Sequence, residues 1–182
     1  MLKKLNLGSG SDILVNHINH DIVDLPNVDV THDLNIYPWP WGDDSFDEIL
    51  MIDVLEHLNE IVPAMEELHR ILKPGGVVTI RVPYWNHACA YIDPTHKRGF
   101  HEQTFHFFDI NSDYYKQRGY YTSATFEISD EALIMTPGDP YFRIPKLGII
   151  YVRRSIFKKL LGWFGNHVGN IISDVQVSLK KV

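Results

Sequence analysis

Leu5-Asn6-Leu7-Gly8-Ser9-Gly10 is the stretch that decides the fold: an apolar run that ends in two glycines one residue apart. The run is typical of a first β-strand, and the glycines are typical of a sharp turn after it. Glycine permits positive φ and the close approach of a ligand, because it has no Cβ. A strand followed by G-x-G therefore predicts a cradle for a nucleotide or cofactor at the end of a buried strand.

The composition is that of an ordinary globular protein, with 45% hydrophobic and 22% charged residues among 182. We expect one domain over residues 1–182, large enough to bury a substantial core. Cys89 is the only cysteine, which excludes an internal disulfide and a cysteine-based zinc finger. The first residues lack the apolar core of a signal peptide, and no window has the apolar length of a membrane span. These features predict a cytoplasmic protein.

The formal net charge of −6 is unevenly distributed. From Arg153 onward there are six Lys or Arg and one acid, whereas the preceding residues hold 11 basic and 22 acidic side chains. A nucleic-acid-binding protein normally presents a basic face. The acidic body therefore argues against a nucleic-acid partner.

Short β-prone runs recur along the first half of the chain, at 18–23, 28–31, 46–52 and 77–82. The spacing of Ile61, Met65, Leu68 and Leu72 predicts a helix, which the breakers Lys73-Pro74-Gly75-Gly76 end. Strands that alternate with helices predict a doubly wound α/β sheet. The first two strands are separated by about seven residues, whereas a parallel crossover takes roughly a dozen. We therefore expect the first crossover helix to be shortened or missing.

The second half has a less regular pattern. Residues 84–121 are aromatic and histidine-rich, and residues 122–136 return to strand character, with a hairpin expected about Ser129-Asp130. Residues 141–168 have helical periodicity, and the alternation in 174–182 predicts a half-exposed, antiparallel final strand. The β-branched run 77–82 suits burial on both faces.

Acidic residues follow three of the predicted strands. Asp21 ends the second strand, Asp33 ends the third, and Asp53 follows the fourth. The carboxyl ends of strands in such a sheet line one crevice, where ligands bind. The Asp21 carboxylate could accept two hydrogen bonds from a ribose diol. Asp33 could accept one from an adenine amine, with Leu34 as an apolar wall for the ring.

With these acids in place, the chain resembles a class I S-adenosylmethionine-dependent methyltransferase over roughly residues 4–83. The matching pieces come in the family's order: 5–10, the Asp21 strand end, His32-Asp33-Leu34, Asp44-Ser45-Phe46-Asp47, 54–58 and 72–76. The resemblance implies a Rossmann-like, mostly parallel sheet of seven strands with an antiparallel last strand. It also implies S-adenosylmethionine as cofactor and S-adenosylhomocysteine as product.

The resemblance further implies which residues bind the cofactor. Gly8 and Gly10 would border its methionine part, Asp21 the ribose, Asp33 the adenine, and Asp53 the sulfonium end. The whole implied set is Leu7, Gly8, Ser9, Gly10, Asp21, Ile22, Asp33, Leu34, Asp53 and Val54. Asp24 competes with Asp21 for the ribose, but Asp24-Leu25-Pro26 is typical of a turn. A nicotinamide cofactor is the weaker alternative, because Ile13 stands where a third glycine would be expected.

The segment Asp93-Pro94-Thr95-His96 is similar to one found in small "type 11" methyltransferase-domain proteins. Histidine is the natural base near neutral pH, so His96 is the first catalytic candidate, with Asp93 as its orienter or as a substrate contact. His57 is a weaker candidate. Asp93 and His96 could instead form a hydrogen-bonded turn without chemistry. A metal set of Asp93, His96, His101 and His106 lacks a firm ligand spacing, so we expect no metal.

Residues 153–164 place an apolar stripe opposite basic side chains. Ile156, Leu160, Leu161 and Phe164 lie opposite Arg153, Arg154, Lys158 and Lys159. Such a helix could pack on its own domain, on a second copy in a homodimer, or on an anionic membrane surface.

The expected function is methyl transfer to an O- or N-nucleophile of a small-molecule or glycan/lipid-linked acceptor. Residues 1–83 would form the cofactor-binding half, and residues 84–182 the substrate side with the last strands. A non-catalytic cofactor-binding or scaffolding module is an alternative from another class, motivated by the short first crossover.

Overall fold

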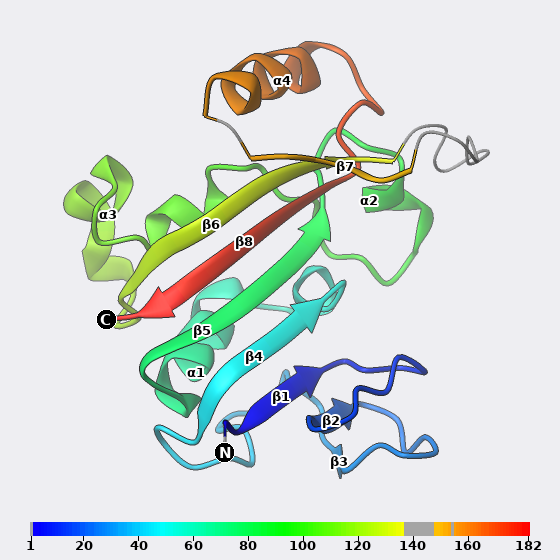
Figure 1. Cartoon of the computed structure of the whole chain (residues 1–182), viewed down its shortest axis with the longest axis vertical. Helices are drawn as coiled ribbons and strands as arrows, with labels where there is room; N and C mark the ends of the chain where they lie inside the picture. The colour runs from blue at the N-terminus through cyan, green and yellow to red at the C-terminus, as the bar shows by residue number, and fades with distance from the viewer. Residues whose placement is uncertain (1, 137–147, 154) are drawn as a thin grey trace.

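The computed structural model describes residues 2–136, 148–153 and 155–182 (Figure 1). One sheet runs through it, with the strand order β3-β2-β1-β4-β5-β8-β6-β7. The strands are β1 (Lys4–Leu7), β2 (Ile18–Asp21), β3 (Val30–Thr31), β4 (Phe46–Ile52), β5 (Leu72–Pro83), β6 (Phe126–Met135), β7 (Ile150–Val152) and β8 (Asp174–Lys181). The helical segments are η1 (Leu55–His57), α1 (Ile61–Ile71), α2 (Cys89–Ile92), η2 (Thr104–Phe107), α3 (Asp113–Arg118), η3 (Gly119–Tyr121) and α4 (Ser155–His167).

The sheet is mostly parallel and becomes antiparallel toward its carboxyl-terminal strands. Strands β3, β2, β1, β4 and β5 pair in parallel. Strand β8 is antiparallel to both β5 and β6, and β7 is antiparallel to β6. The Rossmann-like α/β class and the antiparallel last strand are therefore confirmed. Eight strands are present in the described residues rather than seven, because the short β7 adds an edge beyond β6.

The first crossover helix is missing, as predicted. Residues 8–17 pass from β1 to β2 through turns. A side-chain pair in place of the helix holds this segment: Asn6 Nδ2 donates to Asn19 Oδ1 at 3.1 Å and to the Asp12 carbonyl at 3.0 Å. Asn19 in turn accepts from the Leu14 N–H at 2.9 Å and donates to the Leu14 carbonyl at 3.1 Å. Buried backbone groups need such partners, so two asparagines do what helical hydrogen bonds would otherwise do.

The helices leave one face of the central strands uncovered. In Figure 1, α1 lies behind β4 and β5, and no labelled helix lies in front of them. Along β5 the buried residues Val78, Ile80 and Val82 alternate with half-buried residues of 77–81. The expectation that the run 77–82 is buried on both faces is thus wrong. Core residues of α1 (Ala64, Met65, Leu68 and Ile71) cover one face.

Three element boundaries differ from expectation. Helix α1 ends at Ile71 and β5 begins at the next residue, so the predicted breakers lie inside a strand that shifts register against β4. No hairpin forms at Ser129-Asp130: β6 is one strand, and these residues occupy a register shift against β8. A bulge accommodates turn-forming residues without ending the ladder. A helix is expected over 141–168. In the described part of this range, β7 comes first and the helix begins at Ser155. Residues 137–147 lie outside the described residues.

Candidate cofactor and active site

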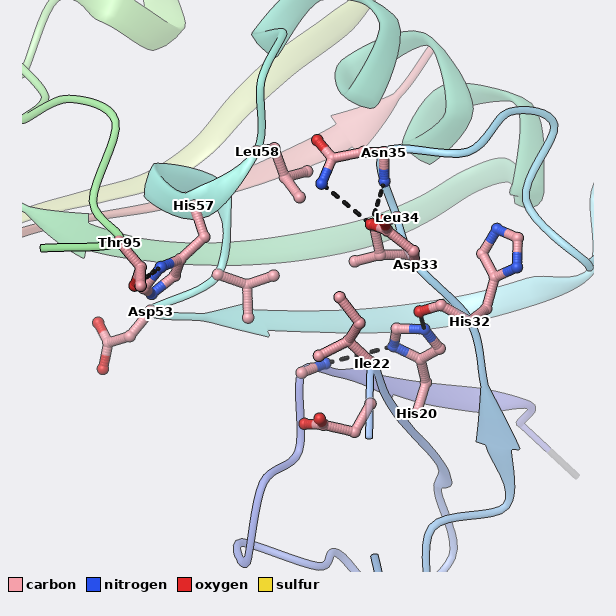
Figure 2. A pocket seen from close by; sticks show the side chains of 13 residues that line it. His20, Ile22, His32, Asp33, Leu34, Asn35, Asp53, His57, Leu58 and Thr95 are labelled. Carbon is pink, nitrogen blue, oxygen red and sulfur yellow. Dashed lines mark hydrogen bonds between the residues drawn. The ribbon is translucent and has the colours of Figure 1, made fainter. Parts of the chain in front are cut away.

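A cavity of about 430 Å³ lies where the parallel strands β1, β2 and β4 end (Figure 2). This volume is within the range of small-molecule sites. The lining consists of Gly8, His20, Asp21, Ile22, His32, Asp33, Leu34, Asn35, Asp53, Val54, His57, Leu58 and Thr95. Figure 2 shows His57 and Thr95 gathered at one end, and His32, Asp33 and Asn35 at the other. Residues that are up to 87 positions apart in the sequence, from Gly8 to Thr95, thus line one cavity.

The glycine turn comes into close contact with the segment after β4. Gly8 has φ +64°, and a Cβ built on it would lie 2.2 Å from Val54 Cγ2. No side chain fits there, so the turn requires glycine for both conformation and space. Gly10 also has positive φ, +49°, but a Cβ there would meet nothing within 4 Å. Asp21 ties the turn to β2, because its carboxylate accepts from the N–H of Gly10 at 2.8 Å and of Val23 at 3.0 Å.

The opposite end of the cavity combines a carboxylate with apolar walls. Asp33 Oδ1 accepts from the backbone N–H of Asn35 at 2.9 Å and from its side-chain amide at 3.0 Å. Leu34 is buried, and its carbonyl accepts from Trp39 Nε1 at 3.0 Å. The turn after β3 is thereby fixed. An aromatic ring placed here would meet the apolar side chains of Leu34 and Leu58 and the carboxylate of Asp33.

His20 is a lining residue that sequence reasoning missed. Its ring is 1% exposed; Nε2 lies 2.9 Å from the His32 carbonyl, and Nδ1 lies 3.5 Å from the Gly8 N–H. Burial lowers the pKa of His20, so the ring is neutral at pH 7. In the sequence it is one polar residue in a strand, and nothing distinguishes it from a surface position.

The cavity brings together seven of the ten predicted cofactor residues: Gly8, Asp21, Ile22, Asp33, Leu34, Asp53 and Val54. Leu7, Ser9 and Gly10 do not line it. Leu7 belongs to the core. Ser9 is buried and its N–H donates to the His20 carbonyl, and the Gly10 N–H donates to the Asp21 carboxylate. Asp53 lies at the border, with φ +55° and an ion pair to Arg81. In Figure 2 its carboxylate points away from the other labelled side chains.

A second cavity, of about 270 Å³, adjoins the first. It is lined by Asp53, Glu56, Arg81, Pro83, Cys89, His96, Thr136, Ile149 and Asp174. Asp53 lines both cavities. Three carboxyl groups and one imidazole accompany a single guanidinium there, so the second cavity suits a ligand with hydroxyl or amino groups.

Glu56, His57 and His96 form a polar cluster between the two cavities. Their ligand-type atoms all lie within 4.8 Å of one another, and the two imidazole rings are 4.7 Å apart. The Glu56 side chain is fully buried, and neither carboxylate oxygen has a hydrogen-bond partner in the described part of the chain. Burial raises the pKa of the Glu56 carboxyl to about 8. Burial, together with the neighbouring His96, lowers the pKa of His57.

Asp93 does not orient His96. It accepts from Thr95, at 2.6 Å from the hydroxyl and 2.8 Å from the N–H, and Thr95 Oγ1 lies 2.9 Å from His57 Nδ1. The His96 ring instead has Nδ1 at 3.3 Å from the Ala90 carbonyl. Sequence reasoning missed Glu56, because an acid next to a histidine in a helical turn usually faces solvent.

The other histidines named for a metal set lie elsewhere. His101 Nε2 is 3.2 Å from Asn166 Oδ1, and His106 Nε2 is 3.1 Å from Glu131 Oε1. Within the described residues, Asp93, His96, His101 and His106 therefore do not converge.

Helix α4 presents its apolar side chains to solvent. Ile156, Phe157, Leu160, Trp163 and Phe164 are each at least half exposed. Its buried positions are Gly162 and Gly165, and Lys158 points inward to form an ion pair with Glu131. The prediction of a packed apolar side and a solvated basic side is thus wrong in part. Apolar side chains of α4 are exposed, and the ion pair with Glu131 holds Lys158 against the domain. In the described part of the chain, no helix has the length and apolarity needed to cross a membrane.

Comparisons in sequence give a methyltransferase relationship for part of the chain. Residues 15–80 match a family model described as a methyltransferase domain. Over 57 residues the chain is 40% identical to an uncharacterized methyltransferase of Schizosaccharomyces pombe, a match that covers 31% of this chain and 20% of the relative. The matched part is therefore about a fifth of that relative's length.

Comparisons in structure extend over nearly the whole chain. A SAM-dependent methyltransferase from Archaeoglobus fulgidus has a TM-score of 0.63 at 18% identity, with 99% of this chain and 86% of that chain covered. A SAM-dependent methyltransferase from Thermotoga maritima, described as a possible histamine N-methyltransferase, has a TM-score of 0.59 at 14% identity, with 100% and 83% covered. The [4+2] cyclase SpnF has a TM-score of 0.56 at 15% identity, with 99% and 74% covered.

These likenesses establish the fold, and the cyclase among them illustrates that one fold hosts more than one reaction. Residues 15–80 have the sequence pattern of a methyltransferase domain, and the chain as a whole has the fold of S-adenosylmethionine-dependent methyltransferases.

Proposed function

We propose that this protein is an S-adenosylmethionine-dependent methyltransferase whose cofactor binds in the 430 Å³ cavity. The observation that carries the proposal is the convergence of the glycine turn, Asp21 and Asp33 on one cavity, at the strand ends of a sheet that matches the methyltransferase fold. Ligands bind at this edge of open α/β sheets.

The lining fits the cofactor part by part. Gly8 lines the cavity without a side chain, next to where the methionine end would lie, and the Asp21 carboxylate retains lone pairs for ribose hydroxyls. Leu34 and Leu58 would contact the adenine, whose amine would reach the free oxygen of Asp33. S-adenosylmethionine bound there supplies a methyl group that its sulfonium has already activated.

The acceptor would enter through the second cavity, because that cavity shares Asp53 with the first. Its carboxyl groups and the His96 imidazole suit a ligand with hydroxyl or amino groups, which supports an O- or N-nucleophile on a small-molecule or glycan/lipid-linked acceptor. Alignment of the nucleophile with the methyl group contributes most in such a displacement, and the nucleophile's proton also needs a place to go. The cluster of Glu56, His57 and His96 is the group best placed to serve the acceptor.

Calorimetric titration with S-adenosylmethionine, S-adenosylhomocysteine and NAD tests the cofactor assignment. We expect micromolar binding of both adenosyl ligands, and at least a tenfold loss in Asp21→Ala. Asp24→Ala is the matched control, because Asp24 does not line the cavity. Ile22→Lys introduces a charge at an exposed lining position without touching the Asp21 hydrogen bonds, and it should weaken binding too. A folded protein that binds NAD alone, or no adenosyl ligand, contradicts the proposal.

Turnover is tested separately, by following S-adenosylhomocysteine formation from S-adenosylmethionine. Water in place of the acceptor would take the methyl group as methanol and release S-adenosylhomocysteine slowly. Slow formation that disappears in Asp21→Ala supports catalysis. Binding without any formation supports the non-catalytic module instead.

We also propose that the exposed side of α4 contacts a second copy of the chain. Its apolar side chains are half exposed, and the segment from Arg153 is basic whereas the rest of the chain is acidic. This charge asymmetry favours self-association over an anionic membrane, because the net charge of −6 is repelled there. Sedimentation of wild type and Leu160→Glu should show a dimer lost in the variant. Monomeric wild type that co-sediments with phosphatidylserine vesicles would contradict this assignment.

A further inference from the structure

We propose that Glu56, His57 and His96 bind a divalent transition-metal ion at the boundary between the two cavities. The three side chains come from η1 and from the loop after α2, and their donor atoms lie within 4.8 Å of one another. Two imidazole nitrogens and one carboxylate are a donor set typical of metal sites that keep a position open for substrate. This site replaces the expectation that no metal is involved.

The hydrogen bonds of His57 leave one ring nitrogen ready to bind a metal. The Thr95 hydroxyl has one proton, which it donates to Asp93 Oδ1 at 2.6 Å. Thr95 Oγ1 must therefore accept from His57 Nδ1–H, 2.9 Å away (Figure 2). The proton on Nδ1 leaves Nε2 with a lone pair. Metal-binding histidines are oriented in the same way, by a hydrogen bond from the second nitrogen to a neighbouring acceptor.

His96 is arranged alike. Its Nδ1 lies 3.3 Å from the Ala90 carbonyl, which can only accept, so Nδ1 carries a proton and the neutral ring has its lone pair on Nε2. That Nε2 faces Glu56 Oε1 at 3.9 Å, beyond hydrogen-bond distance. A lone pair and a carboxylate that face each other across this gap need a cation or a proton between them.

Glu56 is the independent observation that points to a ligand. Its carboxylate is fully buried and without a hydrogen-bond partner in the described residues. A carboxyl group buried without a hydrogen-bond partner is costly whether it is protonated or ionised, so buried groups of this kind are normally hydrogen-bonded, paired or bound to a metal. Among the described residues, the Glu56 oxygens have His96 Nε2 as their charged-type contact, at 3.9 Å, and Arg81 bonds to Asp53 instead.

The spacing needs only a small closure. Two donors about 2.1 Å from a tetrahedral ion lie about 3.4 Å apart, against 3.9 Å for His96 and Glu56 and at most 4.8 Å for the pairs with His57, so metal binding has to draw the three side chains together. Nitrogen donors favour zinc and neighbouring transition metals over magnesium, which prefers oxygen ligands. The three protein ligands leave a fourth position open.

The location of the site suggests its use, and this part rests on the proposed function. His57 lines the first cavity, and Glu56 and His96 line the second. An ion between them would bind an acceptor hydroxyl beside the methyl group and lower the pKa of that hydroxyl. His96 would then act as a ligand rather than as a base, and Asp93 as a positioning residue through Thr95.

Equilibrium dialysis against Zn²⁺ tests the site in the full chain, with Mg²⁺ as the comparison ion. We expect one zinc ion per wild-type chain and at least 100-fold weaker binding in Glu56→Gln and His96→Gln. His101→Gln is the matched control, because His101 bonds Asn166 and lies outside the cluster. Thr95→Val keeps all three ligands but removes the acceptor of His57 Nδ1–H, so we expect about tenfold weaker binding. Co²⁺ substitution should give the visible absorption of a tetrahedral site in wild type and His101→Gln, and not in Glu56→Gln or His96→Gln.

Thermal melting separates loss of the site from loss of the fold. Metal-free Glu56→Gln should melt no lower than wild type, because an unpaired buried carboxyl becomes a neutral amide. Zinc should raise the melting temperature of wild type and His101→Gln, and leave that of Glu56→Gln unchanged. Equal zinc affinity in wild type and Glu56→Gln, or no zinc bound by wild type, overturns the proposal.

S-adenosylhomocysteine titration of the same preparations distinguishes this proposal from the proposed function. Glu56 and His96 do not line the first cavity. Ligand binding without zinc binding overturns the metal site and leaves the cofactor assignment intact. Zinc binding without ligand binding supports the metal site and contradicts the cofactor assignment.

Discussion

The groups around the cofactor cavity stand mostly at the ends of strands, whereas Glu56 and His96 beside the second cavity stand on a single helical turn and on a loop. Gly8, Asp21 and Asp53 directly follow β1, end β2 and follow β4. His96 and Ala90, by contrast, belong to the segment after β5, where α2 is four residues long. The sheet itself brings the strand ends together, so the positions of residues at these ends can be predicted from the order of the strands in the chain. Loop residues meet only through tertiary contacts.

The same difference appears in the hydrogen bonds. Asp21 and Asp33 accept from residues two positions away or from the neighbouring strand turn. His57 depends on Thr95, 38 positions away in the chain. The first region is therefore expected to respond to backbone changes, and the second to changes of individual side chains.

The largest expected effect is that of Gly8→Ala in the first region. A left-handed non-glycine residue costs about 1–2 kcal/mol, and the clash with Val54 adds about 1–3 kcal/mol. We expect a loss of about 3–4 kcal/mol in the free energy of unfolding, measured by urea denaturation. Gly10→Ala shares the positive φ but has open space, so about 1–2 kcal/mol is expected. Equal losses in the two variants would show that the contact with Val54 is unimportant.

The next effect concerns Arg70, which joins α1 to the segment before β4. Its guanidinium donates to both oxygens of Glu67, to Asp43 Oδ1 and to the carbonyls of Trp39 and Trp41. Arg70→Met should cost about 2 kcal/mol, because it leaves a mostly buried Glu67 without its cation. Denaturant titration measures the loss.

Lys116→Met is the control for Arg70→Met, since its ion pair with Asp113 is exposed. It should change stability by less than about 0.5 kcal/mol. Burial alone would raise the pKa of Glu67, but the hydrogen bonds from Arg70 and the Trp39 N–H outweigh it and lower the pKa. The contribution of the pair is therefore present at neutral pH and lost as pH falls below 4.5. A flat acid profile in wild type would contradict this reading.

The smallest effect belongs to His106 in the second region. Its hydrogen bond to Glu131 raises the pKa of His106, against burial and the nearby Lys158, with Asp109 acting in the same direction as Glu131. The stabilisation is fully present below pH 6.5 and is lost as pH rises through the raised pKa. Less than about 1 kcal/mol is expected. His106→Gln should flatten the decline of unfolding free energy above pH 6.5, and equal slopes in both proteins would exclude the pairing.

The fold class, the missing first crossover helix and the final antiparallel strand could be predicted, because apolar alternation and glycine turns act over a few residues. The hairpin at Ser129-Asp130 was wrong because pairing with β8 keeps β6 continuous through a bulge. Tertiary pairing overrides local turn preference there.

The candidate site divides in the same way. Asp21 and Asp33 could be placed from strand order alone, whereas His20 and Glu56 could not. Their roles depend on burial and on the direction in which a side chain points, and neither property can be predicted from a single sequence. Asp93 was paired with the wrong histidine because adjacency in sequence was taken for contact.

A crystal structure with S-adenosylhomocysteine tests the central claim most directly. We predict the adenine between Leu34 and Leu58 with its amine at Asp33, the ribose hydroxyls at Asp21, and the sulfur end toward His57. Density for the ligand elsewhere on the chain, or an empty cavity at saturating ligand, would contradict the account.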